Sequence, residues 1–313
     1  MDSRIYVAGH GGLIGSALVR MLGVRGCGNV ITRTRAELDL SDARSVNGFF
    51  EDQHPDHVLL AAGTVGGIVA NRDRPADFLA GNLAVELNVI GAAHRAGVQR
   101  LIFFASSCMY PRETDQPMAE SALFSGRPEE TSMGYAVAKI AGTQLCLAFN
   151  QQHGGKRFVP VIPNSVYGPH DNFDPASGHV LAALVARFHA AKAKGAASVT
   201  LWGSGKPRRE FLYADDLAEA CWLLLTADLS GVELPLNIGP GSDTSVRELA
   251  STIADTVGYR GKVEWDASMP DGAPQKLLDS SRMKRLGWQA RMPLAEGVRK
   301  TYEWYRAHAA SHA

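Results

Sequence analysis

The sequence predicts an α/β protein with a doubly wound parallel sheet and a smaller C-terminal α/β lobe. Through the first two thirds of the chain, short runs of apolar and β-branched residues alternate with longer helical patterns, which is typical of a parallel sheet covered by helices on both faces. The intervals between the runs suit right-handed crossover helices. The predicted strands of this sheet are 4–8, 29–32, 57–62, 100–105 and 158–162.

Apolar residues at helical spacing predict two long helices at 77–96 and 132–150, the second with Ser132 as a candidate N-cap. Beyond residue 165, turn-rich stretches break the pattern and a second lobe is expected to begin. The predicted elements there are helices at 180–194, from 215, at 245–257 and at 295–307, with strands at 199–202 and 235–238. The expected division is a cofactor domain over 1–165, to which 212–240 returns, and a substrate lobe formed by 166–211 and 241–313.

Composition excludes several classes of function. The chain has 313 residues, 45% of them hydrophobic, and its 32 Lys+Arg balance 32 Asp+Glu, so no basic field favours nucleic acid or an anionic membrane. The four cysteines are far apart and form no CxxC pair, which predicts neither a metal site nor a disulfide framework. No apolar run approaches the roughly 18 residues that cross a bilayer, and strand pattern begins within four residues of Met1, so a cytoplasmic protein without a signal peptide is expected.

A glycine-rich loop follows the first predicted strand. Residues 9–15 read GHGGLIG and open directly into a helical pattern. Glycine permits the tight turn and the close approach of a pyrophosphate, whose charge then lies at the helix N-terminus. An ordinary glycine-rich turn is the alternative, but the strand before and the helix after favour a Rossmann cofactor domain. The residues expected at the cofactor are Gly9, Gly12, Leu13, Ile14 and Gly15.

Two arginines follow the second predicted strand, where enzymes that prefer NAD commonly place an acid. Arg33 and Arg35 favour NADP(H), because a guanidinium can bind a 2′-phosphate with two hydrogen bonds whereas an acid would repel it. The alternative is a solvated arginine pair balanced by Glu37 and Asp39.

Candidate reacting groups follow the fourth strand and lie on the next long helix. The segment 106–111 reads SSCMYP at the carboxyl edge of the sheet, where open α/β folds bind their ligands. Tyr135 and Lys139 are four residues apart and share one helix face. Lowering the pKa of a tyrosine by about three units, to act near neutral pH, requires about 4 kcal/mol, which Lys139 and a nicotinamide cation can share. Taken singly, the pair also fits an amphipathic helix, and Cys108 fits a buried structural thiol.

Together, the glycine loop, Ser-x-Cys and Tyr-x-x-x-Lys resemble the extended short-chain dehydrogenase/reductase family. That resemblance implies a catalytic role for Ser106, Tyr135 and Lys139. It also implies cofactor contacts, besides the residues above, from Ala105, Ser106, Lys139, Pro163 and His179.

Longer strings resemble the GDP-L-fucose synthase family over nearly the whole chain. They are VAGHGGLIGSALVR, AAGTVGGIVANRDRPADF, SSCMYP, QPMAESAL, YAVAKIAGTQLC, YGPHDNF, WGSGKPRREFLYADDLA and PDGAPQKLLD. The resemblance implies an NADP-dependent nucleotide-sugar epimerase/reductase, a homodimer, that exchanges protons at C3 and C5 of a GDP-linked 4-keto-6-deoxy sugar and then reduces C4. It implies Cys108 as base and His179 as acid. The residues implied to hold the GDP-sugar are Arg187, Trp202, Arg209 and Asp271.

This chain departs from that family's pattern at a few positions. Gly11 stands where arginine is usual, so the preference for NADP rests on Arg33 and Arg35; Ser165 stands where asparagine is usual. The readings left open are a related GDP-deoxysugar of the colitose or 6-deoxy-heptose type, a simple nucleotide-sugar 4-epimerase or reductase without C3/C5 exchange, and a nucleotide-sensing module without turnover.

Overall fold

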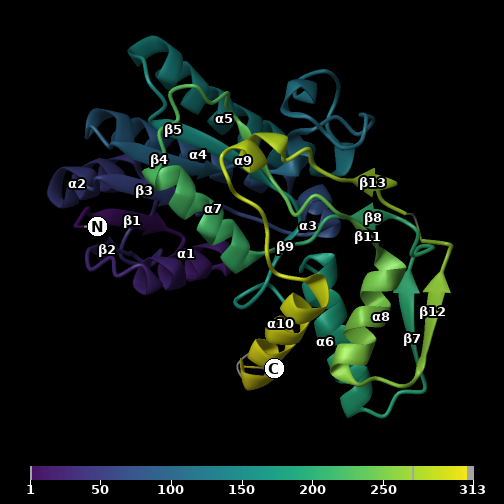
Figure 1. The fold of residues 1–313 in the computed structure, drawn as a ribbon. Helices are drawn as coiled ribbons and strands as arrows, with labels where there is room; N and C mark the ends of the chain where they lie inside the picture. The colour runs from purple at the N-terminus through teal and green to yellow at the C-terminus, as the bar shows by residue number, and fades with distance from the viewer. Residues whose placement is uncertain (1, 270, 309–313) are drawn as a thin grey trace.

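A six-stranded sheet with the strand order β10-β5-β4-β3-β1-β2 forms the centre of the molecule (Figure 1). The structure is a computed structural model that describes residues 2–269 and 271–308. Every pairing in this sheet is parallel, which confirms the predicted doubly wound fold. Its strands are β1 (Ile5–Ala8), β2 (Val30–Ile31), β3 (His57–Leu60), β4 (Arg100–Phe104), β5 (Phe158–Pro163) and β10 (Leu236–Ile238).

Side chains alternate between the two faces of the sheet, as strand geometry requires. Ile5 and Val7 pack into the apolar cluster of one face, while Tyr6 and Ala8 pack into that of the other. The first face is covered by α1 (Leu13–Val24), α7 (Ala214–Thr226) and α9 (Ser281–Arg285). The second is covered by α2 (Ala43–Gln53), α4 (Pro75–Arg95) and α5 (Met133–His153). Both faces are therefore buried, so apolar runs rather than alternating patterns mark these strands.

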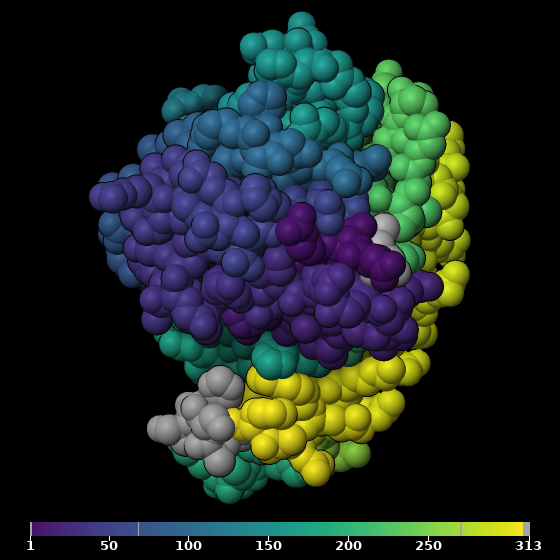
Figure 2. Space-filling view, turned by 90° about the vertical axis from the view of Figure 1, so that its left-hand side faces the viewer, coloured from purple at the N-terminus to yellow at the C-terminus, as the bar shows by residue number. Residues whose placement is uncertain are grey.

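The second lobe lies beyond the carboxyl edge of the sheet and has an apolar core of its own, with Phe188, Leu249 and Tyr302 among its members (Figure 1). Its helices are α6 (Val180–Ala193), α8 (Val246–Val257) and α10 (Leu294–His308), beside the parallel pair β7 (Ser198–Trp202) and β12 (Lys262–Asp266). A three-stranded sheet is formed by β8 (Arg208–Arg209), β11 (Thr244–Ser245) and β13 (Gln275–Lys276). The chain crosses between lobes through β6 (Val166–Tyr167), which pairs with β9 (Leu212–Tyr213). In Figure 2, the yellow C-terminal segments border the purple N-terminal region on two sides.

Two stretches of the C-terminal half return to the sheet. Strand β10 pairs with β5, and α7 packs on α1, in the segment 212–240. Farther along, Met283 and Trp288 join the cluster on the first face, so this part of the segment 241–313 packs against the sheet rather than in the second lobe. Residue 270 and residues 309–313 of that segment lie outside the described residues.

Some helix ends differ from the prediction. Helix α1 begins at Leu13, inside the segment 9–15, so the loop is shorter than predicted. Helix α4 begins at Pro75, because proline suits the first turn of a helix. Ser132 occupies the N-cap position of α5 but its side chain makes no capping hydrogen bond; its hydroxyl donates to the Glu129 carbonyl instead. Helices α2 and α3 (Ile68–Asp73) were not predicted, although Asp42 caps α2 by accepting from two backbone N–H groups.

Candidate active site

The glycine loop between β1 and α1 has the geometry of a dinucleotide site. A Cβ on Gly9 would lie 2.8 Å from the Ala62 Cα, and one on Gly15 would lie 2.0 Å from the Gly9 carbonyl oxygen, so both positions require glycine. Gly12 is the N-cap of α1, and no side chain caps this helix. The first backbone N–H groups of α1, at Leu13 and beyond, therefore have no intrahelical acceptor and suit a pyrophosphate. The loop fits the cofactor that the sequence predicts.

Arg33 and Arg35, which follow β2, form no salt bridge with Glu37 or Asp39. Arg33 donates to the Thr32 carbonyl and lies over the Phe49 ring, while Arg35 is exposed. Hydrogen bonds from Thr34 lower the pKa of Glu37, which is thus held in a local turn rather than in an ion pair with either arginine. A Cβ at Gly11 would meet no atom within 4 Å, so the backbone at this position accommodates a side chain.

Ser106, Cys108 and Tyr135 lie together where β4 ends. Ser106 is the N-cap of the 3-10 turn η1 (Ser107–Met109), and its hydroxyl accepts a 3.2 Å hydrogen bond from the Cys108 backbone N–H. A hydrogen bond also joins the side chains of Ser106 and Tyr135. Cys108 is partly exposed, whereas the other three cysteines of the chain are buried. Cys108 is therefore not a fully buried structural cysteine, unlike the other three.

The protein surroundings hold Tyr135 as a neutral phenol. Burial raises its pKa well above the usual value, and the neighbouring Cys108 and Glu86 side chains raise it further, against the smaller opposing effect of the Ser106 hydrogen bond. This direction is opposite to the lowering expected from Lys139. Burial is the main cause, and the charge of Lys139, which could oppose it, is paired with a carboxylate.

That carboxylate, Glu86 on α4, is a residue of the site that sequence reasoning missed. Its Oε1 lies 3.1 Å from the Lys139 Nζ, and the two side chains are only 2% and 5% exposed. Glu86 lies on the buried stripe of α4, together with Phe78, Asn82 and Val89. A carboxylate at such an apolar-facing position is unusual without a partner, and this was the available signal.

His179 lies at the start of α6, on the far side of the loop that follows β3. The Gly67 N–H of that loop donates to the Ser177 carbonyl, which fixes the turn before His179. Burial lowers the pKa of His179. Within the described residues, no hydrogen bond joins His179 to Cys108 or Tyr135.

Of the substrate residues predicted in the second lobe, Arg209 and Asp271 lie near each other. The Asp271 carboxylate accepts from the Ser204 N–H and hydroxyl at 2.9 and 2.6 Å. Arg209 donates at 2.7 Å to the carbonyls of Arg208 and Ala273; burial lowers its pKa, while nearby Asp271 opposes that effect. Trp202, by contrast, is 59% exposed. Such an indole offers a free face for stacking.

The remaining predicted positions have simpler surroundings. Arg187 donates a 3.3 Å hydrogen bond to the Thr200 carbonyl. Ala105 and Pro163 are buried at the carboxyl ends of β4 and β5, which is the cofactor edge of the sheet. No group of three or more His, Cys, Asp or Glu among residues 2–269 and 271–308 could hold a metal.

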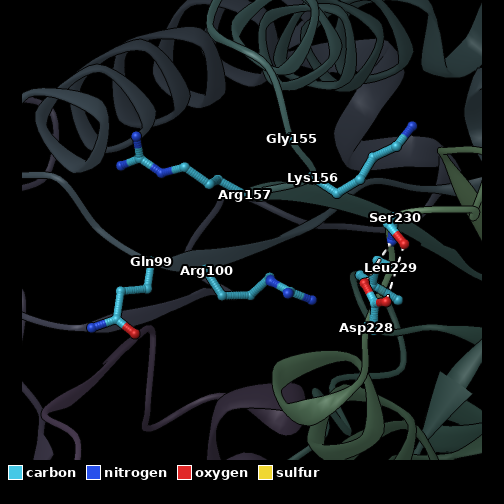
Figure 3. Close-up of a pocket in the computed structure, with 8 residues that line it drawn as sticks. All are labelled: Gln99, Arg100, Gly155, Lys156, Arg157, Asp228, Leu229 and Ser230. Carbon is cyan, nitrogen blue, oxygen red and sulfur yellow. Dashed lines mark hydrogen bonds between the residues drawn. The ribbon is translucent and has the colours of Figure 1, made fainter.

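The described residues form two hollows at the surface of the protein. One of about 320 Å³ includes Arg209, Phe211 and Thr244, where β8 and β11 meet the segment that leads to α10. The other, of about 480 Å³, lies at the amino ends of β4 and β5, where Arg100 points toward Asp228 and Ser230 (Figure 3). Ligands of open α/β sheets bind at the carboxyl ends of the strands, so the second hollow is not part of the candidate site.

None of the helices within the described ranges combines the length and the apolar character that crossing a membrane requires.

Comparisons with known proteins agree with this geometry. The chain is 49% identical over 303 residues to the probable GDP-L-fucose synthase 1 of Oryza sativa subsp. japonica, covering 96% of this chain and 92% of that protein. A solved GDP-6-OMe-4-keto-L-xylo-heptose reductase from C. jejuni matches with a TM-score of 0.93 at 35% identity over 98% of each chain. A GDP-L-fucose synthetase from Naegleria fowleri bound to NADP gives 0.92 at 28% identity, over 99% of this chain and 94% of that one.

A family profile extends from β1 through β10. It is described as the NAD dependent epimerase/dehydratase family and matches residues 5–239. This match and the near full-length relatives confirm the resemblance that the motifs predicted. The chain therefore belongs to the NAD dependent epimerase/dehydratase family, the extended short-chain dehydrogenases/reductases.

Proposed function

We propose that the protein is a GDP-L-fucose synthase-like bifunctional enzyme. It exchanges protons at C3 and C5 of GDP-4-keto-6-deoxy-mannose and then reduces C4 with NADPH. The observation that carries this proposal is the grouping of a partly exposed Cys108 with the hydrogen-bonded pair Ser106 and Tyr135 at the end of β4. A simple reductase needs the phenol but has no use for an accessible thiol beside it.

The cofactor is NADP(H), held at the carboxyl edge of the sheet. The first turn of α1 would bind the pyrophosphate, and Arg33 and Arg35 would bind the 2′-phosphate of the adenosine ribose. Lys139 is expected at the nicotinamide ribose, with Ala105, Pro163 and His179 as the remaining contacts. When bound, NADPH supplies a hydride.

Proton exchange uses the acidity that a C4 ketone gives to its neighbouring C–H bonds. Removing a proton from C3 or C5 produces an enolate, whose oxygen the Ser106 and Tyr135 hydroxyls stabilise. Cys108 is the base, and His179 returns a proton from the other side. Because burial lowers the pKa of His179, its protonated ring is a stronger acid than a free imidazolium, and is less populated at neutral pH.

In the reduction, Tyr135 donates its phenolic proton to the oxygen at C4. The structure favours this role, since its surroundings keep the phenol protonated. The GDP moiety is expected against Arg187, Trp202, Arg209 and Asp271 of the second lobe. The cofactor domain is then 1–165 with 212–240, and the substrate lobe comprises 166–211 and 241–313, except for the stretch around Met283 that packs on the sheet.

The protein is further proposed to be a cytoplasmic homodimer that pairs through α4 and α5. Leu87 and Val137 on these helices are 55% and 40% exposed, and large apolar side chains on adjacent helices suit such an interface. Light scattering at several concentrations would measure twice the monomer mass if this is correct.

The decisive experiment is incubation with GDP-4-keto-6-deoxy-mannose in heavy water. The wild-type protein should incorporate deuterium at C3 and C5, whereas Cys108→Ser should lose incorporation and retain NADPH affinity, because a hydroxyl is a poor base at neutral pH. Unlabelled product from the wild type would leave only a 4-reductase. Equal labelling by the variant would remove Cys108 from the mechanism.

Related 4-keto GDP-sugars can be offered to the enzyme as alternative substrates. The solved C. jejuni protein is a reductase of a GDP-linked 4-keto-heptose, so the shared fold accommodates more than one sugar. Comparing kcat/KM for 4-keto GDP-sugars that differ at C3 and C6 would identify the preferred one.

A further inference from the structure

The ion pair between Glu86 and Lys139 is the feature that the proposed chemistry does not use. Its N···O distance is 3.1 Å and both side chains are buried. Neither Glu86 oxygen has another hydrogen-bond partner among the described residues. A buried ion pair is weak evidence for stability, because desolvating both charges offsets their attraction. The pair also borders Tyr135, because the Lys139 Nζ lies 5.7 Å from the centroid of that ring.

The surrounding residues make specific room for this carboxylate. Gly142, one turn after Lys139 on α5, faces Glu86, and a Cβ there would lie 2.5 Å from the Glu86 Oε2 and 2.6 Å from the Phe103 Cζ. The Phe103 ring centroid is 4.8 Å from the Lys139 Nζ. The ammonium is thus held between a carboxylate and an aromatic face, which fixes both its place and its charge balance.

Lys139 connects Glu86 to the phenol. Its Nζ lies 5.7 Å from the centroid of the Tyr135 ring, close enough for an unbalanced ammonium to stabilise a phenolate. With Glu86 ionised, the pair carries no net charge and that stabilisation is largely lost. A reduction begins with a neutral phenol, because the phenol must give its proton to the oxygen formed at C4.

We propose that Glu86 is a positioning residue that pairs with Lys139 and thereby keeps Tyr135 as the neutral phenol, the form that donates a proton during reduction. The inference rests on the proposed reduction at C4. When Tyr135 has donated its proton, an O–H bond exists at C4 and the phenolate takes a proton from solvent before the next turnover. Glu86 thus raises the fraction of the enzyme that holds the proton-donating phenol at a given pH.

The titratable groups around this pair are few. Tyr135, Lys139 and Cys146 on α5 interact electrostatically with Glu86, and burial together with Glu86 raises the pKa of the Cys146 thiol. Cys108 is the further titratable neighbour of Tyr135. Burial also raises the pKa of Glu86 itself, an effect that Lys139 opposes.

The test is titration of Tyr135 in Glu86→Gln. Phenolate absorbance is measured against pH without substrate, and the signal of Tyr135 is obtained by subtracting the same titration of a Tyr135→Phe partner. We expect Tyr135 to ionise at least about 1 pH unit lower in Glu86→Gln than in the wild type. The alkaline limb of the pH profile of C4 reduction should move in the same direction.

A matched control is Glu296→Gln, which removes a carboxylate from the exposed pair with Lys300 on α10. It should change neither titration. If Glu86→Gln does not fold, Glu86→Asp carries the test, with a smaller shift in the same direction because its charge lies farther from Lys139. An unchanged Tyr135 titration in a folded Glu86 variant overturns the inference. Absence of C4 reduction by the wild type would instead contradict the proposed function, and the substrate-free titration distinguishes the two.

Discussion

The sheet and the second lobe hold their parts of the site by different means. At the sheet, Tyr135 and Lys139 extend from a helix packed on a buried face, and Ser106 caps a turn at the end of a central strand. In the second lobe, Arg209 and Asp271 are held by hydrogen bonds to loop backbone and to Ser204. The difference teaches that the proposed reacting groups are fixed by the packed sheet, whereas the proposed sugar-binding groups can change with modest effects on the fold.

The largest effect is expected from Tyr135→Phe, which changes a residue held by the packed sheet. Loss of the proton donor should lower kcat for C4 reduction by about 10²–10⁴ and leave NADPH affinity within a few-fold. Steady-state kinetics and a fluorescence titration of NADPH measure both. Unchanged turnover would show that another group donates the proton.

Asp171, in the segment that joins the two regions, should give the next largest effect. Burial raises its pKa to about 7, against which its hydrogen bond from the Asn172 N–H acts weakly. Because the pKa of Asp171 is higher in the folded than in the unfolded state, Asp171 contributes its full stabilisation below pH about 4. That contribution to the free energy of unfolding is lost as pH rises through about 7, by up to about 1.4 kcal/mol per pH unit.

Asp171→Asn should therefore flatten this dependence. Urea unfolding of both proteins between pH 5 and pH 8 measures it, and the variant should gain stability relative to the wild type as pH rises. Parallel curves for the two proteins would mean that Asp171 does not titrate in this range.

Arg209→Lys tests the second lobe, where loop backbone holds the side chain. A lysine ammonium lacks the planar set of donors with which Arg209 binds the Arg208 and Ala273 carbonyls and could also bind a diphosphate. KM for the GDP-sugar should therefore rise about 10–100-fold, with little change in kcat. Arg260→Lys, in the exposed pair with Asp255, is the matched control. A fall in kcat equal to the rise in KM would place Arg209 among the rigid reacting groups instead.

Gly11→Arg tests whether the cofactor loop has room for a further phosphate contact. Since a Cβ at Gly11 meets no atom within 4 Å, the fold should be unaffected. We expect KM for NADPH to fall about 3–10-fold while KM for NADH does not. Equal changes for both cofactors would show that the new guanidinium does not reach the 2′-phosphate.

The smallest effect is expected at Ser165, which follows β5 with a φ of 35°. Asparagine adopts left-handed backbone more readily than serine, so Ser165→Asn should stabilise the protein by a few tenths of a kcal/mol and raise Tm by about 1 °C. Calorimetry measures the difference, with Ser165→Ala expected to change Tm in the opposite direction. A lower Tm for the asparagine variant would show that the Ser165 hydroxyl contributes more than the backbone preference.

The sequence predicts the sheet well because its strands are buried on both faces and stand out as apolar runs. Leu59 and Ile102 are fully buried, as their neighbours in those runs suggest. Helix α2 was missed because its apolar residues are few, although Asp42 marks its start. The position of Trp288 against the sheet depends on a long-range return of the chain, which local patterns do not encode.

In the candidate site, too, some residues could be identified from local sequence pattern and others depend on how distant helices pack. Motif spacing identified Tyr135 and Lys139 because one helix face presents both. Glu86 could not be identified from sequence because it meets Lys139, 53 positions later, only when α4 and α5 pack together. The raised pKa of Tyr135 follows from that packing and could not be inferred from the helix alone.

The ladder between β6 and β9 has a consequence for how such proteins diversify. Val166 pairs with Leu212 and Tyr167 with Tyr213, so the excursion that contains α6 and β7 begins and ends at hydrogen-bonded neighbours. Substitutions and length changes within that excursion leave the register of the six-stranded sheet intact. New sugar specificities can therefore accumulate there while the proton and hydride chemistry at the sheet edge is inherited unaltered.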